Sequence, residues 1–287
     1  KPSKPFFLGV GFVKPHTPLY APKKYFDMFP LEGILLPEIK NGDIDDIHYK
    51  DVYPPSEMGL SYYNKLMLSF PESEGLKKFL RAYLACIAFM DDQVGKVLNA
   101  LENSKFSENT IVVFTSDHGW QMGQKEYLYK NSPWEESTRI PMIIKTPQKQ
   151  LGEVQEPVSL IDIYPTLIDL CKLQKTNSES NLEIDGNTLY PLLKKPNSKS
   201  WAGSEGALTL LGVGINKPID GLAINKNKAA PWHIEIIKDL DNSYLKKQNY
   251  TIRTRDFRYI LYNDGGEELY DHRNDPVSYT HLRAHET

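Results

Sequence analysis

The sequence has few cysteines and no long apolar run. Its only cysteines are Cys86 and Cys171, and two lone cysteines do not make a disulfide framework, so the redox compartment stays open. Both lie in apolar helical patterns, which predicts that they are buried and act as small hydrophobic side chains. No apolar stretch reaches the about 20 residues of a transmembrane helix, so we expect no membrane span.

An excess of one charge is also absent. The formal net charge is −3 at pH 7 and no basic stripe stands out, which argues against nucleic acid as a partner. Hydrophobic residues make up 40% and charged residues 25% of the 287 positions, a balance typical of globular proteins. A chain of this length can form one large domain, or one domain with a smaller one, and bury a sizeable core.

The two ends lack the features of a complete protein. No initiating Met or signal peptide is present, and residues 5–13, PFFLGVGFV, have the composition of a buried strand. Because a domain rarely begins with its central strand, we expect further residues upstream. Residues 277–287 carry no pattern that would continue the fold and resemble a translated adapter sequence, so we expect a non-native tail there.

Hydrophobic periodicity predicts an α/β fold. Residues 75–103 carry apolar side chains at helical spacing and form the clearest predicted helix. Residues 110–115 and 140–146 are short apolar runs of the kind found in buried parallel strands. A second helix is expected over residues 160–173, with Ser159 as its cap. Strands and helices in this order indicate a mostly parallel sheet sandwiched by helices.

The remaining segments differ in character. Residues 31–75 mix polar and proline-containing stretches, and we expect them to run over the surface. Residues 207–211 and 250–263 are expected to be strands, with a turn at Asp264-Gly265-Gly266 before the next one, so a small antiparallel sheet is predicted. The expected division is an α/β domain over residues 1–195, a small antiparallel β subdomain over 196–276 and the tail over 277–287.

A candidate metal site follows the first of these strands. Asp117 and His118 come directly after residues 110–115, at the carboxyl end of the expected strand, where open α/β sheets bind ligands. A carboxylate oxygen and a neutral imidazole nitrogen are both metal ligands, and Gly119 allows the backbone to turn. On the dipeptide alone, a simple turn with Asp117 as a cap is the better interpretation.

Two further segments supply candidate anion-binding groups. Lys125 and Lys130 lie close behind the Asp-His pair, and an ammonium there can hold an anionic oxygen or neutralise a leaving group, although a solvated surface lysine is the usual alternative. His16 follows the strand expected at residues 5–13 and could donate a proton to a bridging oxygen. Taken alone, such a histidine is more often structural.

Four segments, in this order, resemble the sulfatase family. They read PFFLGVGFVKPHTPLYAPKKYFDMFP, TSDHGWQMGQKEYLYKNSPWEESTRIPMIIKTP, PVSLIDIYPTLIDLC and YTIRTRDFRYILY…GGEELYDHRNDP. Such a set is specific, whereas any one of them would be a weak signal. The resemblance covers residues 5–276 apart from 212–249, and it is strongest to iduronate-2-sulfatase and its bacterial relatives.

The resemblance implies an alkaline-phosphatase-like fold and hydrolysis of a sulfate ester. It implies that Asp117 and His118 are two ligands of one divalent cation, usually calcium. Lys130 matches the lysine that contacts the sulfate, and His16 matches the active-site histidine. Lys125 falls where relatives often carry a Lys or His that contacts substrate. The implied substrate is a sulfated sugar or glycan, and the implied location is periplasmic, secreted or lysosomal.

Two positions depart from the family pattern. Gln124 stands where relatives carry an acidic residue, and Val13 replaces a His that is common there. The first leaves the local charge balance open, and the second leaves a substrate contact open.

The family's nucleophile does not occur in this sequence. It is a formylglycine made within a Cys/Ser-x-Pro-Ser-Arg segment, and neither Cys86 nor Cys171 has that context. In the family it lies upstream, together with the acidic residues that complete the metal site. We therefore expect a C-terminal fragment of a sulfatase that is inactive by itself. Two alternatives stay open: a phosphodiesterase or phosphonate-ester hydrolase with the same half-site, and a non-catalytic truncated domain that binds sulfated glycan.

Overall fold

The computed structural model describes residues 5–40, 42–53, 55, 57–71, 73–148, 151–173, 184–211 and 248–275. The helices are α1 (Lys23–Asp27), α2 (Tyr49–Val52), α3 (Met58–Ser69), α4 (Glu74–Glu102), α5 (Glu135–Thr138), α6 (Ile163–Cys171) and α7 (Tyr190–Lys194), with 3-10 turns η1 (Leu31–Gly33), η2 (Ser107–Asn109), η3 (Gln124–Glu126) and η4 (Leu160–Asp162). The strands are β1 (Val112–Thr115), β2 (Gln121–Met122), β3 (Leu128–Tyr129), β4 (Met142–Lys145), β5 (Gly206–Leu211), β6 (Asn249–Thr254), β7 (Phe257–Leu261) and β8 (Glu267–Asp271). The tail expected at residues 277–287 lies outside the described residues.

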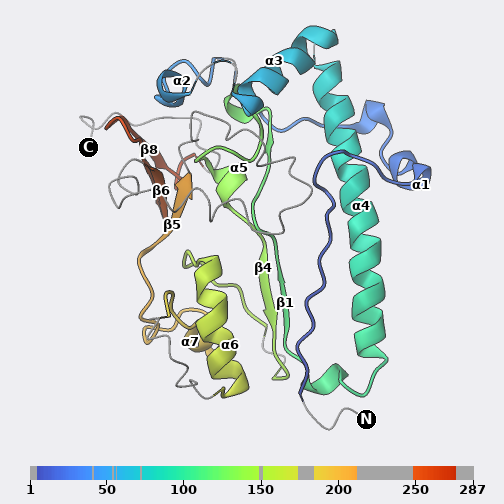
Figure 1. Cartoon of the computed structure of the whole chain (residues 1–287), viewed down its shortest axis with the longest axis vertical. Helices are drawn as coiled ribbons and strands as arrows, with labels where there is room; N and C mark the ends of the chain where they lie inside the picture. The colour runs from blue at the N-terminus through green and yellow to red at the C-terminus, as the bar shows by residue number, and fades with distance from the viewer. Residues whose placement is uncertain are drawn as a thin grey trace, which may run out of the picture.

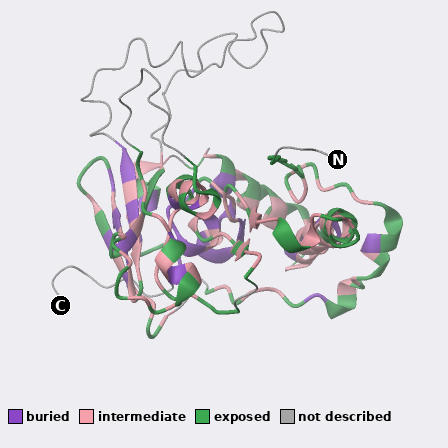
Figure 2. Ribbon diagram, turned by 90° about the horizontal axis from the view of Figure 1, so that it is seen from below, coloured by how far each residue is buried: buried purple, intermediate pink, exposed green. Residues whose placement is uncertain are grey.

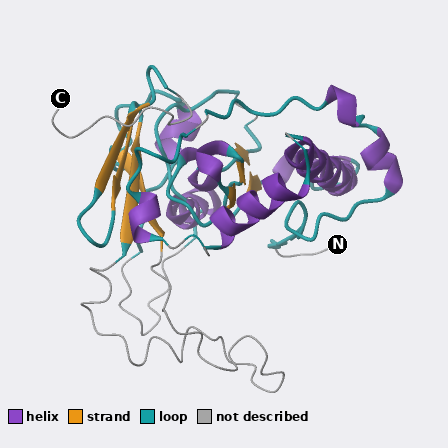
Figure 3. Ribbon diagram, turned by 90° about the horizontal axis from the view of Figure 1, so that it is seen from above, coloured by secondary structure: helices purple, strands orange, loops and turns teal. Residues whose placement is uncertain are grey.

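The predicted C-terminal antiparallel sheet is confirmed. Strands β5, β6, β7 and β8 pair in that order, each antiparallel to its neighbour, and the sheet stands at one end of the molecule with α4 toward the other (Figure 3). The turn between β7 and β8 contains Gly265 with φ 93°, a conformation that glycine adopts without steric cost. Along β7, buried residues alternate with half-buried ones, so one face of the sheet packs inward.

The strands of the α/β part pair differently from the prediction. β1 and β4 are antiparallel, with Val113 opposite Ile144, and no parallel pair occurs among the described residues. Neither strand is fully buried, and Ile143 is 60% exposed. An apolar run predicts a strand but does not set its direction, which depends on the connection between the two strands. The expected mostly parallel sheet is therefore not present in the described part of the chain.

Residues 5–13 do not form the buried strand that their composition predicts. The segment pairs with no described strand and every residue in it is exposed (dark blue in Figure 1). Two of its aromatic side chains have different surroundings. Phe7 is 89% exposed, whereas the Phe6 ring packs edge-on against Phe106 with centroids 5.2 Å apart. An apolar strand is buried only where layers cover both of its faces, and no described element covers this one.

The predicted long helix is confirmed as α4. Its apolar face is buried only in the first half, at residues such as Leu76 and Cys86, whereas Val97 and Leu98 are 38% and 43% exposed. Cys171, at the end of α6, is exposed, so the prediction of two buried thiols holds for Cys86 alone. The described helices include none that is both long and apolar enough to span a membrane.

Residues 31–75 are not a surface excursion, as the sequence suggested. They contain α3, whose first turn is capped by Glu57: its Oε2 accepts from the amides of Gly59 at 2.7 Å and Leu60 at 3.2 Å. Ile47 and Tyr49 of the same stretch are buried. The prolines and polar residues there mark the turns between short elements, not continuous exposure.

An aromatic core joins this stretch to the loop after β3 and to the C-terminal sheet. Its members are Ile47, Tyr49, Leu60, Tyr127, Trp134, Ile260, Tyr262 and Tyr270. Figure 2 shows buried residues both on the sheet and in the middle of the molecule. The expected β subdomain therefore shares one core with the rest of the chain.

Candidate functional site

Four of the five predicted site residues meet in one cluster. Asp117 and His118 follow β1, and Lys130 directly follows β3. The Lys130 ammonium lies 2.7 Å from Nε2 of His118, and a carboxylate oxygen of Asp117 lies 3.7 Å from the same nitrogen. The rings of His16 and His118 have centroids 6.4 Å apart. The chain thus brings together two imidazoles, an ammonium and a carboxylate from segments that are far apart in sequence.

The hydrogen bonds of His118 determine which ring nitrogen carries the proton. Nδ1 lies 2.7 Å from the carbonyl oxygen of Gly119. A carbonyl oxygen can only accept, so Nδ1 carries the proton, and in the neutral ring Nε2 keeps its lone pair. That lone pair accepts from the Lys130 ammonium. A histidine held in this way presents Nε2 to a cation, as metal-binding histidines do.

His16 is oriented by the same kind of contact. Its Nδ1 lies 2.7 Å from the carbonyl oxygen of Thr17, so Nδ1 is the donor and Nε2 is free in the neutral ring. The His16 amide donates to the Val13 carbonyl at 3.0 Å, which closes a turn. The side chain is exposed. His16 can therefore take up a proton at Nε2 and pass it to a molecule bound beside it.

The loop that carries Asp117 and His118 is held by α5. The amide of Gly119 donates to the Ser137 carbonyl at 2.8 Å, and the amide of Trp120 donates to the Glu136 carbonyl at 2.5 Å. A Cβ on Gly119 would stand 2.0 Å from that Glu136 oxygen. Glycine is required here because of this close approach and not, as the sequence suggested, because the backbone needs glycine to turn.

Trp120 is a site residue that the sequence reasoning missed. It is buried, and its ring lies 6.1 Å from that of His16 and 6.3 Å from that of His118, measured between centroids. On its other sides it meets Tyr83 at 5.5 Å and Tyr129 at 5.2 Å. Trp120 therefore forms an aromatic wall behind both histidines. Its place in the sequence, two residues after His118, was the one feature that could have indicated its position beside the site.

Lys125 does not join the cluster. Its side chain is 1% exposed, and its ammonium forms an ion pair with Asp43 at 2.8 Å. The Lys125 amide donates to the same carboxylate at 3.2 Å. Burial raises the pKa of Asp43, and the ammonium opposes that shift. The expected substrate contact is not available to a lysine enclosed in this way, because the left-handed turn at Gly123 and Lys125, with φ 112° and 56°, directs the chain inward.

Glu136 of α5, whose carbonyl oxygen accepts from the Trp120 amide, carries a largely buried carboxyl. Burial raises its pKa to about 7, the neighbouring Glu135 adds to the shift, and Arg258 and Lys125 reduce it. Its side chain therefore exchanges a proton near neutral pH. No sequence pattern signals this shift, because it depends on packing.

Asp117 and His118 fit part of a cation site. The Asp117 carboxylate is 86% exposed and lies 3.7 Å from Nε2 of His118. The lone pair of that nitrogen faces the Lys130 ammonium, so a cation held by Asp117 and His118 would take the place of this contact. Within the described residues, no group of three or more His, Cys, Asp or Glu side chains could hold a metal ion. Calcium takes about six to eight oxygen ligands. The pair could hold such an ion only together with ligands that these residues do not supply.

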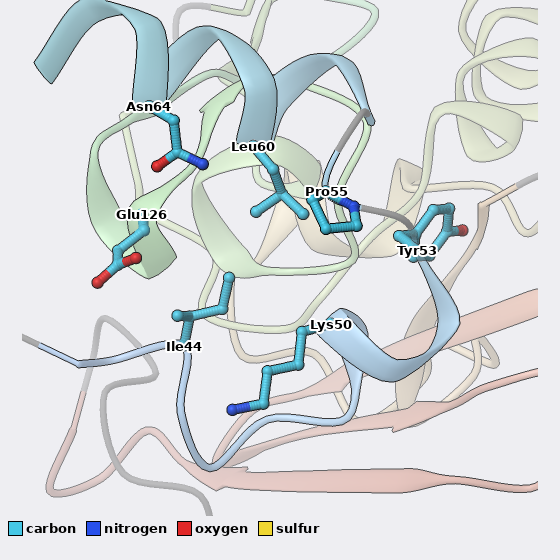
Figure 4. Close-up of a pocket in the computed structure, with 7 residues that line it drawn as sticks. All are labelled: Ile44, Lys50, Tyr53, Pro55, Leu60, Asn64 and Glu126. Carbon is cyan, nitrogen blue, oxygen red and sulfur yellow. The ribbon is translucent and has the colours of Figure 1, made fainter. Parts of the chain in front are cut away.

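One hollow of the surface lies apart from the cluster. It is lined by Ile44, Lys50, Tyr53, Pro55, Leu60, Asn64 and Glu126. Figure 4 shows these side chains around it, and none of the four clustered residues takes part. The hollow is therefore separate from the cluster.

Sequence comparison with known proteins identifies the family to which the chain is similar. The profile of the Sulfatase family matches residues 1–173. A protein named Sulfatase, from Formosa agariphila, is 33% identical over 95% of this chain and 45% of its own length. Human Iduronate 2-sulfatase is 30% identical over 60% of this chain and 37% of its own length. The chain spans about half the length of the curated relatives it matches.

Superposition on solved structures shows which known fold the chain shares. The phosphonate monoester hydrolase of Agrobacterium radiobacter superposes with a TM-score of 0.69 at 24% identity, over 96% of this chain and 52% of that one. A structure described as a 2-O GAG sulfatase gives a TM-score of 0.64 at 21% identity, over 88% of this chain and 48% of that one. These likenesses show the alkaline-phosphatase-like fold of such hydrolases.

The family profile covers more than half of the chain, and a relative with 33% identity extends over nearly all of it. The range matched by the profile includes His16, Asp117, His118 and Lys130. The chain therefore belongs to the sulfatase family.

Proposed function

We propose that this chain carries part of the active site of a sulfuric ester hydrolase that acts on a sulfated sugar or glycan. The observation that carries the proposal is the contact of the Lys130 ammonium with Nε2 of His118 at 2.7 Å, beside the Asp117 carboxylate. An ammonium, an unprotonated imidazole nitrogen and a carboxylate at one point suit a cation and an oxyanion bound next to each other. Membership of the sulfatase family supports the proposal.

Each residue of the cluster has a chemical role in this proposal. Lys130 would hold a sulfate oxygen through a charge-assisted hydrogen bond. His16 in its protonated form would give its proton to the bridging oxygen as the sulfur–oxygen bond breaks, so that the sugar leaves as an alcohol. Asp117 and His118 would hold a divalent cation, calcium in the family, and such an ion polarises sulfate oxygens when bound. Trp120 would keep water away behind the histidines.

The nucleophile is part of the proposal and lies outside this sequence. The family uses a formylglycine, and the segment that forms it does not occur among the 287 residues. We expect the longer protein to hydrolyse the sulfate ester and this chain alone to be inactive, because the cluster offers groups that bind and protonate but none that attacks sulfur. Turnover of a sulfated disaccharide by this chain alone would contradict that expectation.

The substrate class is proposed from the relatives. Human Iduronate 2-sulfatase is named for a sulfated uronate, and a structural neighbour is described as acting on glycosaminoglycan. We expect sulfated uronate glycans for this chain's longer form. A periplasmic, secreted or lysosomal location is proposed on the same resemblance, and fractionation of cells that express the longer form would check it.

A second candidate is a phosphonate-ester hydrolase. It is favoured by the superposition with the Agrobacterium enzyme, which has the highest TM-score among the structures compared above. Its oxyanion has a similar shape to sulfate and could meet Lys130 in the same way. Activity of the longer protein on a sulfate ester and on a phosphonate monoester, measured side by side, distinguishes the two.

Binding of inorganic sulfate to this chain tests the site directly. Titration followed by NMR of the histidine rings measures weak affinities and shows where the ion binds. Lys130→Ala should weaken binding by about tenfold or more, because a hydrogen bond to a charged group contributes about 1.5–3 kcal/mol. Lys50→Ala removes an ammonium in the separate hollow of Figure 4 and should leave affinity unchanged. Equal sulfate affinity for wild type and Lys130→Ala would refute the proposal.

A further inference from the structure

The main chain around Lys130 needs support from other elements. A lysine has a flexible stem, so the place of its ammonium depends on where the backbone is held. Tyr129, directly before it, has φ 76°, a left-handed conformation that is unfavourable for a residue other than glycine. Contacts from outside the loop must therefore keep this stretch in place.

Two tyrosine hydroxyls meet the carbonyl oxygen of Asn131, the residue after Lys130. Tyr49 donates to it at 3.0 Å, and the hydroxyl of Tyr127 lies 2.9 Å from it. A carbonyl oxygen has two lone pairs and can accept from both. Lys130 thus lies between a strained residue and a carbonyl that is held from two sides.

A count of protons shows that the two tyrosines are not equivalent. Tyr127 has one hydroxyl proton, and a carboxylate oxygen of Glu57 lies 3.0 Å away as a second acceptor for it. Tyr49 has a weaker alternative, the hydroxyl oxygen of Tyr127 at 3.5 Å. Tyr49 is therefore the donor that the Asn131 carbonyl keeps when Tyr127 donates to Glu57.

Both hydroxyls are fixed in direction. Tyr49 and Tyr127 are 0% exposed, and their rings meet edge to face with centroids 5.7 Å apart. Tyr49 also stacks on Tyr53 at 4.2 Å. Burial raises the pKa of both hydroxyls above its ordinary value, so they remain protonated donors at neutral pH.

We propose that Tyr49 and Tyr127 are positioning residues for the sulfate site: they hold the Asn131 carbonyl and thereby set the point from which Lys130 reaches the anion. The inference rests on the proposed function, in which Lys130 binds sulfate. Tyr49 lies in α2 and acts through Lys130, which is 2.7 Å from His118. Residues near position 50 thus serve a site formed near positions 118 and 130.

The test measures the affinity of this chain for inorganic sulfate by NMR titration. Tyr49→Phe keeps the ring and removes the hydroxyl, and it should raise the dissociation constant about fivefold, the usual effect of one lost hydrogen bond. Tyr53→Phe is the matched control, because it removes a hydroxyl from the same aromatic cluster whose contact is Asn249 at 2.5 Å. Its affinity should stay within about twofold of wild type.

A double-mutant cycle separates positioning from general loss of structure. In a Lys130→Ala chain, Tyr49→Phe should cause no further loss of affinity, because the group that it positions is gone. The same loss with and without Lys130 would overturn the inference. Should Tyr49→Phe not fold, as judged by circular dichroism, Tyr127→Phe provides a second cycle. Its loss should be smaller, because the Tyr127 proton is shared with Glu57, and should again disappear in the Lys130→Ala chain.

The outcomes also separate this inference from the proposed function. If Lys130→Ala leaves sulfate affinity unchanged, the sulfate site and the positioning role both fail. If Lys130→Ala weakens binding but Tyr49→Phe behaves like Tyr53→Phe, the site stands and the positioning role is refuted.

Discussion

Glu268 of β8 is a buried carboxylate with five hydrogen-bond donors around it. It is 0% exposed. Its Oε1 accepts from the amides of His48 at 2.9 Å and Tyr49 at 3.3 Å and from the Tyr262 hydroxyl at 2.8 Å, and its Oε2 accepts from Trp134 Nε1 at 3.1 Å and the Tyr270 hydroxyl at 2.7 Å. One side chain thus ties the C-terminal sheet to α2 and to the loop that follows Lys130.

The substitution Glu268→Gln measures what this carboxylate contributes. The amide nitrogen of Gln donates and cannot accept, so it faces either the Trp134 indole N–H or the backbone amides of His48 and Tyr49. None of these donors can reverse its role, and one stranded donor costs about 1–3 kcal/mol. The remaining hydrogen bonds lose their charged acceptor and weaken by about 1 kcal/mol each. The expected loss of unfolding free energy is about 3 kcal/mol or more, a large share of the about 5–15 kcal/mol typical of a domain.

Urea denaturation followed by circular dichroism gives that free energy by linear extrapolation. The matched control is Glu267→Gln, the same change at the preceding residue of β8, whose side chain is exposed. The control should stay within about 0.5 kcal/mol of wild type. A Glu268→Gln chain as stable as the control would refute the argument that this carboxylate holds the two parts together.

Three further predictions concern the surroundings of the site. Lys125→Ala leaves the Asp43 carboxyl buried without its partner and should cost about 3–5 kcal/mol, whereas Lys130→Ala should cost under about 1 kcal/mol; chemical denaturation of both variants distinguishes the structural lysine from the site lysine. Gly119→Ala places a Cβ 2.0 Å from the Glu136 carbonyl oxygen, while Gly95 in α4 has open space around it; thermal unfolding should show a marked loss for the first and no loss for Gly95→Ala, since Ala is the better helix former. Burial raises the pKa of Glu136 from 4.5 to about 7, so the folded chain retains a proton that the unfolded chain releases in this range, and stability should fall by about 1–3 kcal/mol as pH rises through it; a Glu136→Gln chain with the same pH dependence as wild type would contradict this.

The sequence was sufficient where local pattern determines structure. The apolar face of α4 and the alternation of β6 and β7 predicted those elements, because helical and strand periods differ and each was sustained over several residues. The position of Asp117 and His118 at the end of a strand predicted a place where ligands bind. In the structure Lys130, which follows β3, lies 2.7 Å from Nε2 of His118.

Long-range contacts explain what the sequence did not reveal. Lys125 and Lys130 are five residues apart and look alike in the sequence, yet one pairs with Asp43 and the other with His118. The choice depends on left-handed backbone turns at Gly123, Lys125 and Tyr129, of which only the glycine is a recognisable signal. Similarly, the apolar run at residues 5–13 predicts burial, but burial depends on neighbours that a single segment does not specify.

Two adjacent carboxyls of α5 make the stability of the site depend on pH in opposite directions. Glu135 is buried, which would raise its pKa, but Arg258 at 2.5 Å and Arg253 at 3.0 Å outweigh burial and hold the pKa below its ordinary 4.5. A lowered pKa stabilises the fold at pH values above 4.5, and this stabilisation is lost as pH falls below that value. Glu136 acts in reverse, because its raised pKa makes the fold less stable as pH rises from 4.5 to about 7.

The two opposite effects of pH both act on α5, which contains Glu135 and Glu136. The carbonyls of α5 hold the amides of Gly119 and Trp120, and Arg258 of the C-terminal sheet holds both Glu135 and the Pro133 carbonyl. Breaking this ion pair by acid therefore loosens the loop that carries Asp117 and His118. We expect the loop that carries Asp117 and His118 to be held most firmly at mildly acidic pH, between the range in which Glu135 takes up a proton and that in which Glu136 loses one. The C-terminal sheet thus acts on the site through a buried charge pair, although it contributes none of the residues that would touch sulfate.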